Sequence, residues 1–159
     1  MKRVLITGAG GFVGSRVLQQ WQGKYELCTF PKGFLCTATE TEVLTQTRAR
    51  DPDVILHTAA LSDTGYCAQH PAEAYRANVE LPVWLARAAQ QTKAKLVAFS
   101  SDQVYAGTKQ QGPLSEALDL HPTNIYGQYI LEAEQRVQEL CPDSVHLRAS
   151  WMYDLPGYG

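Results

Sequence analysis

The sequence TGAGGFVG, residues 7–14, joins a short apolar run to a helical pattern. The run before it, RVLITG at residues 3–8, is rich in β-branched residues and is typical of a buried β-strand. After it, apolar residues recur along one face of a predicted helix that ends near Gly23; they are Phe12, Val13, Val17, Leu18 and Trp21. The stretch therefore predicts a strand, a glycine-rich turn and a helix in direct succession.

The spacing of the glycines in this turn follows the pattern GxxGxxG. Gly8 permits a tight turn, Gly11 lets the backbone approach a pyrophosphate, and Gly14 lets the helix pack on the sheet. The pyrophosphate would meet the unpaired amides and the positive dipole end of the helix. A plain structural turn is the alternative, and the strand–turn–helix context favours a dinucleotide site. We expect its residues to be Thr7, Gly8, Gly10, Gly11, Phe12, Val13 and Gly14.

The alternation of strands and helices continues along the chain. Further strands are predicted at residues 25–30, 53–60, 95–101 and 144–153, and further helices at residues 39–51, 71–92 and 125–141. Thr39 or Thr41 is the expected cap of the first of these helices, and Pro82 implies a kink or a break in the second. We predict an α/β fold, a doubly wound parallel sheet (Rossmann-like) with helices on both faces.

Composition and charge exclude several classes of protein. A chain of 159 residues fits one domain, and a net charge of -2 predicts no nucleic-acid partner and no membrane partner. No apolar run is long enough to span a bilayer. Four scattered cysteines without a CxxC spacing indicate reduced thiols and a cytoplasmic protein. The histidines have no metal-ligand spacing, so we predict no metal site.

The second strand bears on the choice between NAD and NADP. An acidic residue at its end would bind the adenosine ribose of NAD, but this strand ends in CTFPKG. Lys32 could face a 2′-phosphate instead, although a single exposed lysine is more often only solvated. The cofactor is therefore expected to be NADP or NAD, with Lys32 favouring NADP.

Five motifs give the chain a family resemblance. The segments TGAGGFVG, DVILHTAA, RANV, FSSDQVY and YGQYILEAE resemble the extended short-chain dehydrogenase/reductase family (NAD(P)-dependent epimerase/dehydratase type). The order SSDQVYAG, PTNIYGQYILEAE and LRASW is most similar to the dTDP-4-dehydrorhamnose reductase group. The resemblance covers only the cofactor-binding half of such a protein. We expect residues 1–159 to form one NAD(P)-binding Rossmann domain, truncated before the substrate-binding segment, since DLPGYG follows directly on a strand expected to be buried.

The resemblance implies roles for five further residues. Ala59 and Ala60 would line the cofactor, and Asn78 would organise the site through its amide. Ser101 would polarise the substrate carbonyl, and Tyr126 would donate the proton. Each residue also has a plainer interpretation, since Ser101 could cap a turn, Asn78 could bind backbone, and Tyr126 could lie on the surface. Their order together with the glycine motif favours an inherited active site.

One position departs from the family pattern. The lysine that usually follows the catalytic tyrosine by four residues is Ile130. The sequence YAGTK also places Lys109 four residues after Tyr105, but the chemistry needs both side chains on one helix face. Gly107 and the following QQGP make a helix there unfavourable, so we reject this pair.

Three functions remain open. The first is a reductase acting on a nucleotide-sugar ketone, impaired by the missing lysine or using another base. The second is a non-catalytic nucleotide-binding or regulatory protein of the same fold. The third is a nucleotide-sugar epimerase or dehydratase, ranked last because Gln103 replaces the glutamate that dehydratases usually carry after Asp102. The expected partner is a small-molecule substrate, namely a nucleotide sugar. Formation of a homodimer is left open.

Overall fold

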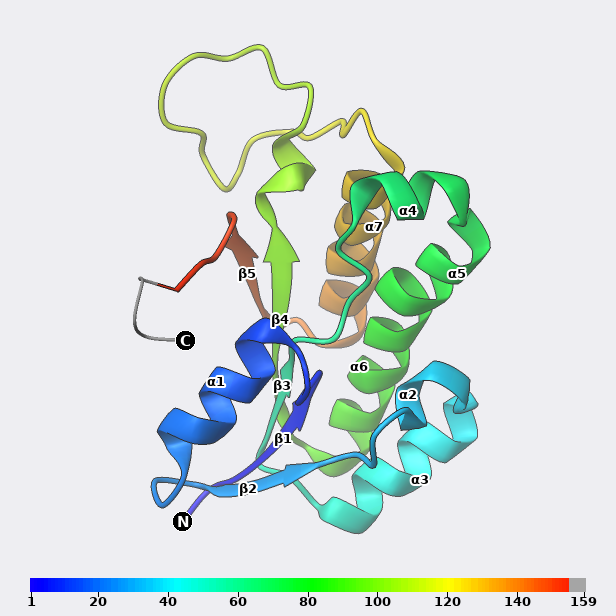
Figure 1. The fold of residues 1–159 in the computed structure, drawn as a ribbon, viewed down its shortest axis with the longest axis vertical. Helices are drawn as coiled ribbons and strands as arrows, with labels where there is room; N and C mark the ends of the chain where they lie inside the picture. The colour runs from blue at the N-terminus through cyan, green and yellow to red at the C-terminus, as the bar shows by residue number, and fades with distance from the viewer. Residues whose placement is uncertain (155–159) are drawn as a thin grey trace.

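The computed structural model describes residues 1–154. All but the first residue of the C-terminal sequence DLPGYG, on which the expected truncation rests, therefore lie outside the described residues. The described chain alternates strands and helices around one central sheet (Figure 1).

The sheet has five strands in the order β2-β1-β3-β4-β5. Its strands are β1 (Arg3–Thr7), β2 (Glu26–Thr29), β3 (Val54–His57), β4 (Lys95–Ser101) and β5 (Val145–Ala149). All neighbouring pairs are parallel, and Val4 of β1 lies opposite Val54 of β3. The chain leaves β1 toward β2 on one side and returns to β3 on the other. The glycine-rich turn therefore follows the strand at which the order reverses, as predicted, and this is where such sheets bind ligands.

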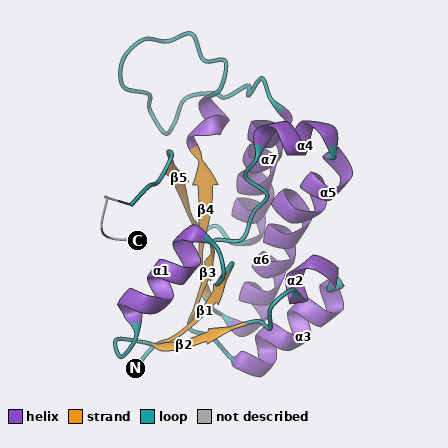
Figure 2. Cartoon of the chain, viewed as in Figure 1, coloured by secondary structure: helices purple, strands orange, loops and turns teal. Residues whose placement is uncertain are grey.

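Helices cover both faces of the sheet, which confirms the predicted fold class. Figure 2 shows α1 (Phe12–Trp21) on one side of the strands and the other helices on the opposite side. Those helices are α2 (Phe34–Thr37), α3 (Glu40–Arg50), α4 (Thr64–Gln69), α5 (Pro71–Tyr75), α6 (Leu81–Thr92) and α7 (Ile125–Leu140). Of the two expected caps, Thr39 begins α3, because its side chain accepts the Glu42 amide while the Glu42 carboxylate accepts the Thr39 amide.

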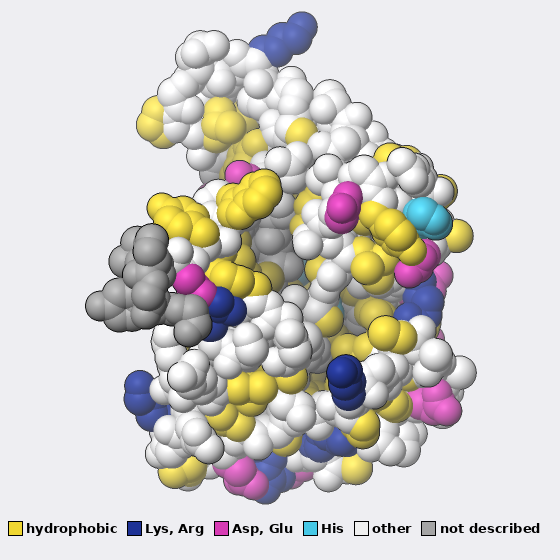
Figure 3. Space-filling view, in the orientation of Figure 1, with side chains coloured by type: hydrophobic (Ala, Val, Ile, Leu, Met, Phe, Trp, Pro, Cys, Tyr) yellow, Lys and Arg dark blue, Asp and Glu magenta, His cyan; other side chains and the backbone are white. Residues whose placement is uncertain are grey.

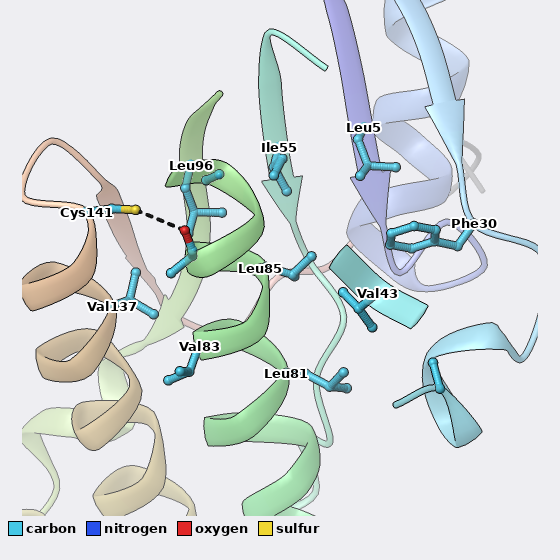
Figure 4. Packing of buried hydrophobic residues seen from close by; sticks show 13 residues of the cluster. Leu5, Phe30, Val43, Ile55, Leu81, Val83, Leu85, Leu96, Val137 and Cys141 are labelled. Carbon is cyan, nitrogen blue, oxygen red and sulfur yellow. Dashed lines mark hydrogen bonds between the residues drawn. The ribbon is translucent and has the colours of Figure 1, made fainter. Parts of the chain in front are cut away.

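The main core lies between the sheet and helices α3, α6 and α7. Figure 4 shows Leu5 and Ile55 from the sheet facing Leu85 of α6 and Val43 of α3. Full burial of one such side chain contributes about 1.5–3 kcal/mol relative to leaving it in water. The Cys141 thiol at the end of α7 donates to the Ala86 carbonyl over 3.3 Å. These contacts hold α7 against α6.

The proline inside the long helical pattern does not break it. The chain stays helical from Pro71 to Thr92, and the disturbance takes the form of a π-helical turn, Arg76–Glu80, just before Pro82. Pro82 lacks the N–H that an α-helix would use, and the Leu81 amide reaches back five residues to the Arg76 carbonyl. Of the kink or break that Pro82 implied, the structure shows a local distortion without a break, and Asn78, which lies in the π turn, is 1% exposed.

The last strand differs from its prediction in length and in burial. β5 ends at Ala149 rather than at residue 153, and the side chains that follow, Trp151 and Tyr153, are exposed. β5 is also an edge strand with Val145 and Leu147 more than one third exposed, so the expected burial is wrong. Its alternation of valine, leucine and polar residues looked like a buried run, but only its inner face contacts another layer.

Candidate nucleotide and catalytic site

The glycine-rich turn is shaped by close backbone contacts. Gly8 has φ +70°, and a Cβ atom there would lie 2.6 Å from the Thr58 hydroxyl oxygen. A Cβ atom on Gly14 would lie 2.1 Å from the Gly8 carbonyl oxygen. Only glycine can therefore occupy these two positions without moving backbone, in agreement with the tight turn predicted at Gly8. Gly14 packs on the turn itself rather than on the sheet.

The start of α1 leaves backbone donors free for an anion. The first helical bond runs from the Ser15 amide to the Gly11 carbonyl over 3.0 Å, so the amides of Phe12, Val13 and Gly14 have no acceptor within the helix. Gly11 begins the helix without a capping side chain. Gly10 is exposed, and a Cβ atom there would meet nothing within 4 Å. This open turn at a helix N-terminus has the form that binds phosphate groups.

Aromatic and aliphatic side chains flank the turn. Phe12 is 41% exposed, and the Arg16 guanidinium lies 3.6 Å from the centre of its ring. Val13 is half-buried. Figure 3 shows the surface hollowed close to this turn, with hydrophobic side chains gathered around the hollow.

Thr7 connects the glycine-rich turn to the end of β3. Its hydroxyl oxygen lies 3.1 Å from the Thr58 amide, 3.3 Å from the Ala59 amide and 2.7 Å from Nδ1 of His57. The segment containing Ala59 and Ala60 is thereby held beside the turn, and its contact with a cofactor stays a prediction. His57, to which the sequence assigned no role, is the residue that the sequence analysis missed here. Its position at the end of a strand predicted to be buried could have indicated a buried histidine beside the turn.

Asn78 holds the other end of the same segment. Its side-chain oxygen accepts the Leu61 amide over 3.0 Å, and its side-chain nitrogen donates to the Leu61 carbonyl over 2.9 Å. Asn78 is thus satisfied by backbone, and that same contact fixes the chain beside Ala59 and Ala60. These bonds agree with the plain interpretation of Asn78 as a side chain that binds backbone, and its role in organising the site stays a prediction.

Lys32 is exposed in the turn between β2 and α2. The basic group that binds the end of β2 is a different residue, Arg50, whose Nε donates to the Thr29 carbonyl over 3.0 Å. Its guanidinium also lies 5.0 Å from the centre of the Phe30 ring. Lys32 therefore stays a prediction as a ligand of a 2′-phosphate.

Ser101 and Tyr126 are brought together by the packing of α7 on the end of β4. Ser101 is 8% exposed and caps a 3₁₀ turn, Asp102–Tyr105, by accepting the Gln103 amide over 3.1 Å. Asn124 begins α7 by accepting the Gly127 amide over 2.7 Å. A Cβ atom on Gly127 would lie 2.4 Å from the Gln103 carbonyl oxygen, so α7 and the 3₁₀ turn touch through this glycine.

Tyr126 is a buried phenol rather than a surface tyrosine. It is 7% exposed, and this burial raises its pKa above the ordinary value, while hydrogen bonding from Ser101 acts in the opposite direction. The nearby Cys67 and Asp102 also raise the pKa. The phenol therefore remains protonated at neutral pH.

Ile130 lies one helical turn beyond Tyr126 and is 6% exposed. Both side chains belong to one apolar cluster with Cys67 and Val104. Ile130 also lines a small cavity of about 20 Å³ together with Ala59, Ala60 and Asn78. The side chain at this position therefore shares a cavity with residues predicted to line the cofactor, but it offers neither charge nor a hydrogen-bond donor.

The second tyrosine–lysine spacing is not a catalytic pair. Tyr105 ends the 3₁₀ turn, Gly107 has φ +83°, and Lys109 is exposed outside any helix. The Tyr105 hydroxyl donates to the Ser115 carbonyl over 3.3 Å and accepts from Arg148 over 2.8 Å. The rejection of this pair is confirmed.

Among residues 1–154, no group of three or more His, Cys, Asp or Glu side chains could hold a metal ion. Within the same range, no helix has both the length and the apolar character that crossing a bilayer requires. The four cysteines are free thiols.

Curated proteins similar to this chain include dTDP-4-dehydrorhamnose reductases. The chain is 31% identical over 155 residues to a dTDP-4-dehydrorhamnose reductase of Aggregatibacter actinomycetemcomitans, a match that covers 96% of this chain and 52% of that protein. It is 30% identical over 154 residues to the spore coat polysaccharide biosynthesis protein SpsK of Bacillus subtilis, with 96% and 54% covered. The chain thus spans about half the length of the curated relatives it matches.

Solved structures similar to this chain also include dTDP-4-dehydrorhamnose reductases. The dTDP-4-dehydrorhamnose reductase of Clostridium acetobutylicum matches with a TM-score of 0.89 at 30% identity, covering 95% of this chain and 54% of that one. The Bacillus anthracis reductase, solved in complex with NADP, matches with a TM-score of 0.88 at 31% identity, covering 96% and 54%. The Bordetella bronchiseptica enzyme WbmG, in complex with NAD and UDP, shares the fold at 20% identity and a TM-score of 0.77, with 92% and 52% covered.

The family model described as the RmlD substrate binding domain matches residues 1–159, the entire sequence. The chain therefore belongs to the RmlD family.

Proposed function

We propose that the protein is the cofactor-binding part of an NAD(P)H-dependent reductase of the dTDP-4-dehydrorhamnose reductase type, acting on a nucleotide-sugar ketone. The observation that carries this proposal is the packing of α7 on the 3₁₀ turn after β4. It brings the Tyr126 phenol to Ser101 at the carboxyl end of the sheet, the same end as the glycine-rich turn. The substrate-binding segment would be contributed by residues outside 1–159.

The described residues fit a dinucleotide. The exposed Gly10 leaves room for a pyrophosphate, and the first amides of α1 supply hydrogen-bond donors. Ala59 and Ala60 have small side chains and lie beside this turn. A bound NADPH or NADH would supply the hydride. NADP is the preferred cofactor in this proposal, because β2 carries no acidic residue at its end and Lys32 is exposed nearby.

Tyr126 would hold and donate the proton. Its raised pKa keeps the phenol protonated, so it can protonate an alkoxide that develops on a carbonyl held by Ser101. Ile130 cannot stabilise a tyrosinate or donate to the ribose of the cofactor. A charged hydrogen bond contributes about 1.5–3 kcal/mol, and poorly tuned acid catalysis costs roughly 10²-fold in rate. Reduction should suffer less than oxidation, because oxidation would need tyrosinate.

A non-catalytic nucleotide-binding or regulatory protein is the second candidate. It is favoured by Ile130, which packs with Tyr126 in an apolar cluster where the catalytic lysine would have required space and solvation. An epimerase or dehydratase ranks third, because the Gln103 side chain accepts from Asn124 over 3.1 Å and so supports the start of α7. The proposed partner is a small-molecule nucleotide sugar, and cytoplasmic localisation and homodimer formation remain proposals.

Calorimetry with NADPH and NADH tests the cofactor step on the 159-residue chain. The parent should bind NADPH more tightly than NADH, and Gly11→Asp should abolish binding because the carboxylate would lie against the pyrophosphate. Gln20→Asp, which adds the same charge at an exposed position further along α1, is the matched control and should bind like the parent. Equal affinity of the parent and Gly11→Asp would place the site elsewhere.

A further inference from the structure

The ion pair of Glu134 and Arg148 is the most shielded in the described part of the chain. Arg148 Nη2 lies 2.8 Å from one carboxylate oxygen of Glu134, and Nε lies 3.1 Å from the other. The two side chains are 19% and 12% exposed, whereas those of the ion pair between Arg87 and Glu40 are 41% and 37% exposed. The hydrogen bond to Glu134 raises the pKa of the Arg148 guanidinium. Such a two-bond geometry fixes both partners in position.

Glu134 joins α7 to the end of β4. Its carboxylate accepts the Ser100 hydroxyl, and Ser100 directly precedes Ser101 on β4. Glu134 lies two helical turns beyond Tyr126 and one beyond Ile130, so the three side chains share one face of α7. One carboxylate therefore connects the strand that carries Ser101 with the helix face that carries Tyr126.

Arg148 joins the same point to β5 and to the long loop before α7. It lies opposite Ser100 in the register of β4 and β5. Its Nη1 donates to the Tyr105 hydroxyl over 2.8 Å and to the Glu116 carbonyl over 3.3 Å. Tyr105 ends the 3₁₀ turn that Ser101 caps, and Glu116 belongs to the loop that leads to α7. The pair thus contacts β4, the end of the 3₁₀ turn and the loop before α7, and it joins β5 to α7.

We infer that Glu134 and Arg148 are positioning residues that set the Tyr126 phenol against the Ser101 hydroxyl. Neither side chain takes part in the reaction. The inference rests on the proposed function for its meaning in catalysis, but the placement of the two hydroxyls can be measured without turnover.

The test follows the Tyr126 phenol by NMR in the full 159-residue chain with tyrosine labelled at the ζ carbon. Tyr126→Phe assigns the resonance. In Arg148→Met the Tyr126 resonance should move, and the pKa of the phenol should rise by roughly half a unit to one unit, the size of one lost hydrogen bond to the tyrosinate. Arg148→Lys, which keeps the charge but loses the two-bond geometry, should shift it less.

Arg87→Met is the control, because it removes an ion pair between α6 and α3. It should leave the Tyr126 resonance and pKa unchanged. Glu134→Gln keeps the size of the side chain and is the second test variant if Arg148→Met does not fold. It should move the Tyr126 resonance in the same direction as Arg148→Met. An unmoved Tyr126 in folded Arg148→Met, or in Glu134→Gln, would overturn the inference and leave the pair a purely structural contact.

The same samples separate this inference from the proposed function. If the parent fails to bind NADPH while Arg148→Met still displaces Tyr126, the function is wrong and the positioning role stands. If the parent binds NADPH and Tyr126 does not move, the positioning role is wrong and the function stands.

Discussion

The Thr7 hydroxyl donates to Nδ1 of His57 across 2.7 Å, linking β1 to β3 beneath the glycine-rich turn. The direction of this bond follows from the other two contacts of the oxygen. The amides of Thr58 and Ala59 both donate to it, so its own proton is directed at His57. His57 must therefore be the neutral tautomer with its proton on Nε2.

A neutral, buried His57 predicts acid sensitivity. Burial lowers the pKa of His57 from 6.5 to about 4, with a smaller contribution from His146. Between these two values the unfolded chain binds a proton that the folded chain does not, so stability falls as the pH falls from 6.5 toward 4. This histidine alone should cost about 3 kcal/mol of unfolding free energy between pH 7 and pH 4. Urea unfolding at several pH values measures it.

His57→Gln removes the titrating group and should flatten this pH dependence while lowering stability at pH 7. His70→Gln alters an exposed histidine and should keep the parent's pH profile. Burial also lowers the pKa of His146, which adds to the loss in the same direction. An unchanged slope in His57→Gln would mean that His57 is already protonated in the folded protein.

Alanine substitutions at two glycines of the turn should affect folding stability and NADPH binding separately. Gly14→Ala places a methyl group against the Gly8 carbonyl backbone and should destabilise the fold by about 1–3 kcal/mol or more. Gly10→Ala meets no protein atom, so thermal unfolding should stay within a degree or two of the parent. Its methyl group would instead enter the space predicted for the pyrophosphate and weaken NADPH binding about tenfold. Parent-like NADPH affinity in Gly10→Ala would remove Gly10 from the site.

The sequence predicted the parts of the fold that repeat a periodic pattern. The four central segments around β1, β3, β4 and α7 have long apolar periodicity or a glycine signature, and all were located to within a few residues. The helix α4 was missed because it is six residues long and depends on a cap, Asp63, whose carboxylate accepts the Tyr66 amide over 2.8 Å. A short capped turn has no periodicity to detect.

The site was predictable in its residue types but not in its connections. Asn78 was expected in the site, yet its partner Leu61 lies 17 residues earlier, and the π turn that aims it inward could not be read from Pro82 alone. The ion pair of Glu134 and Arg148 joins different elements. Such contacts depend on the tertiary register of β4 and β5, which local sequence does not specify.

Asn78→Ala should weaken both the fold and the nucleotide site. The change leaves the partly buried Leu61 amide without its acceptor and opens a cavity at the buried Asn78 position, so we expect a loss of about 2–4 kcal/mol in urea unfolding. The affinity for NADPH should fall as well, because Ala59 and Ala60 lose their support. Gln128→Ala is the control, since it removes an exposed amide that donates to the Pro122 carbonyl over 3.1 Å. A stable Asn78→Ala with unchanged NADPH affinity would show that the hydrogen bonds between Asn78 and Leu61 do not support the nucleotide site.

Ile130→Lys restores the residue that the family pattern contains. The new ammonium would lie one helical turn from Tyr126 and one from Glu134, beside the small cavity that Ala59 and Ala60 also line. Since a nearby cation favours tyrosinate, the pKa of Tyr126 should fall, and the ribose of the cofactor should gain a donor. We expect a tenfold or greater gain in NADPH affinity, about 1.4 kcal/mol, and a modest loss of stability from burying the ammonium.

Ile130→Met, similar in length and uncharged, separates charge from shape and should leave both the pKa of Tyr126 and the affinity near their parent values. Affinity should rise before any rate does, because the ribose contact needs only this side chain, whereas turnover also needs a substrate pocket. If calorimetry and Tyr126 titration show the lysine and methionine variants behaving alike, Ile130 does not face the cofactor, and the non-catalytic binding role becomes the better account of this chain.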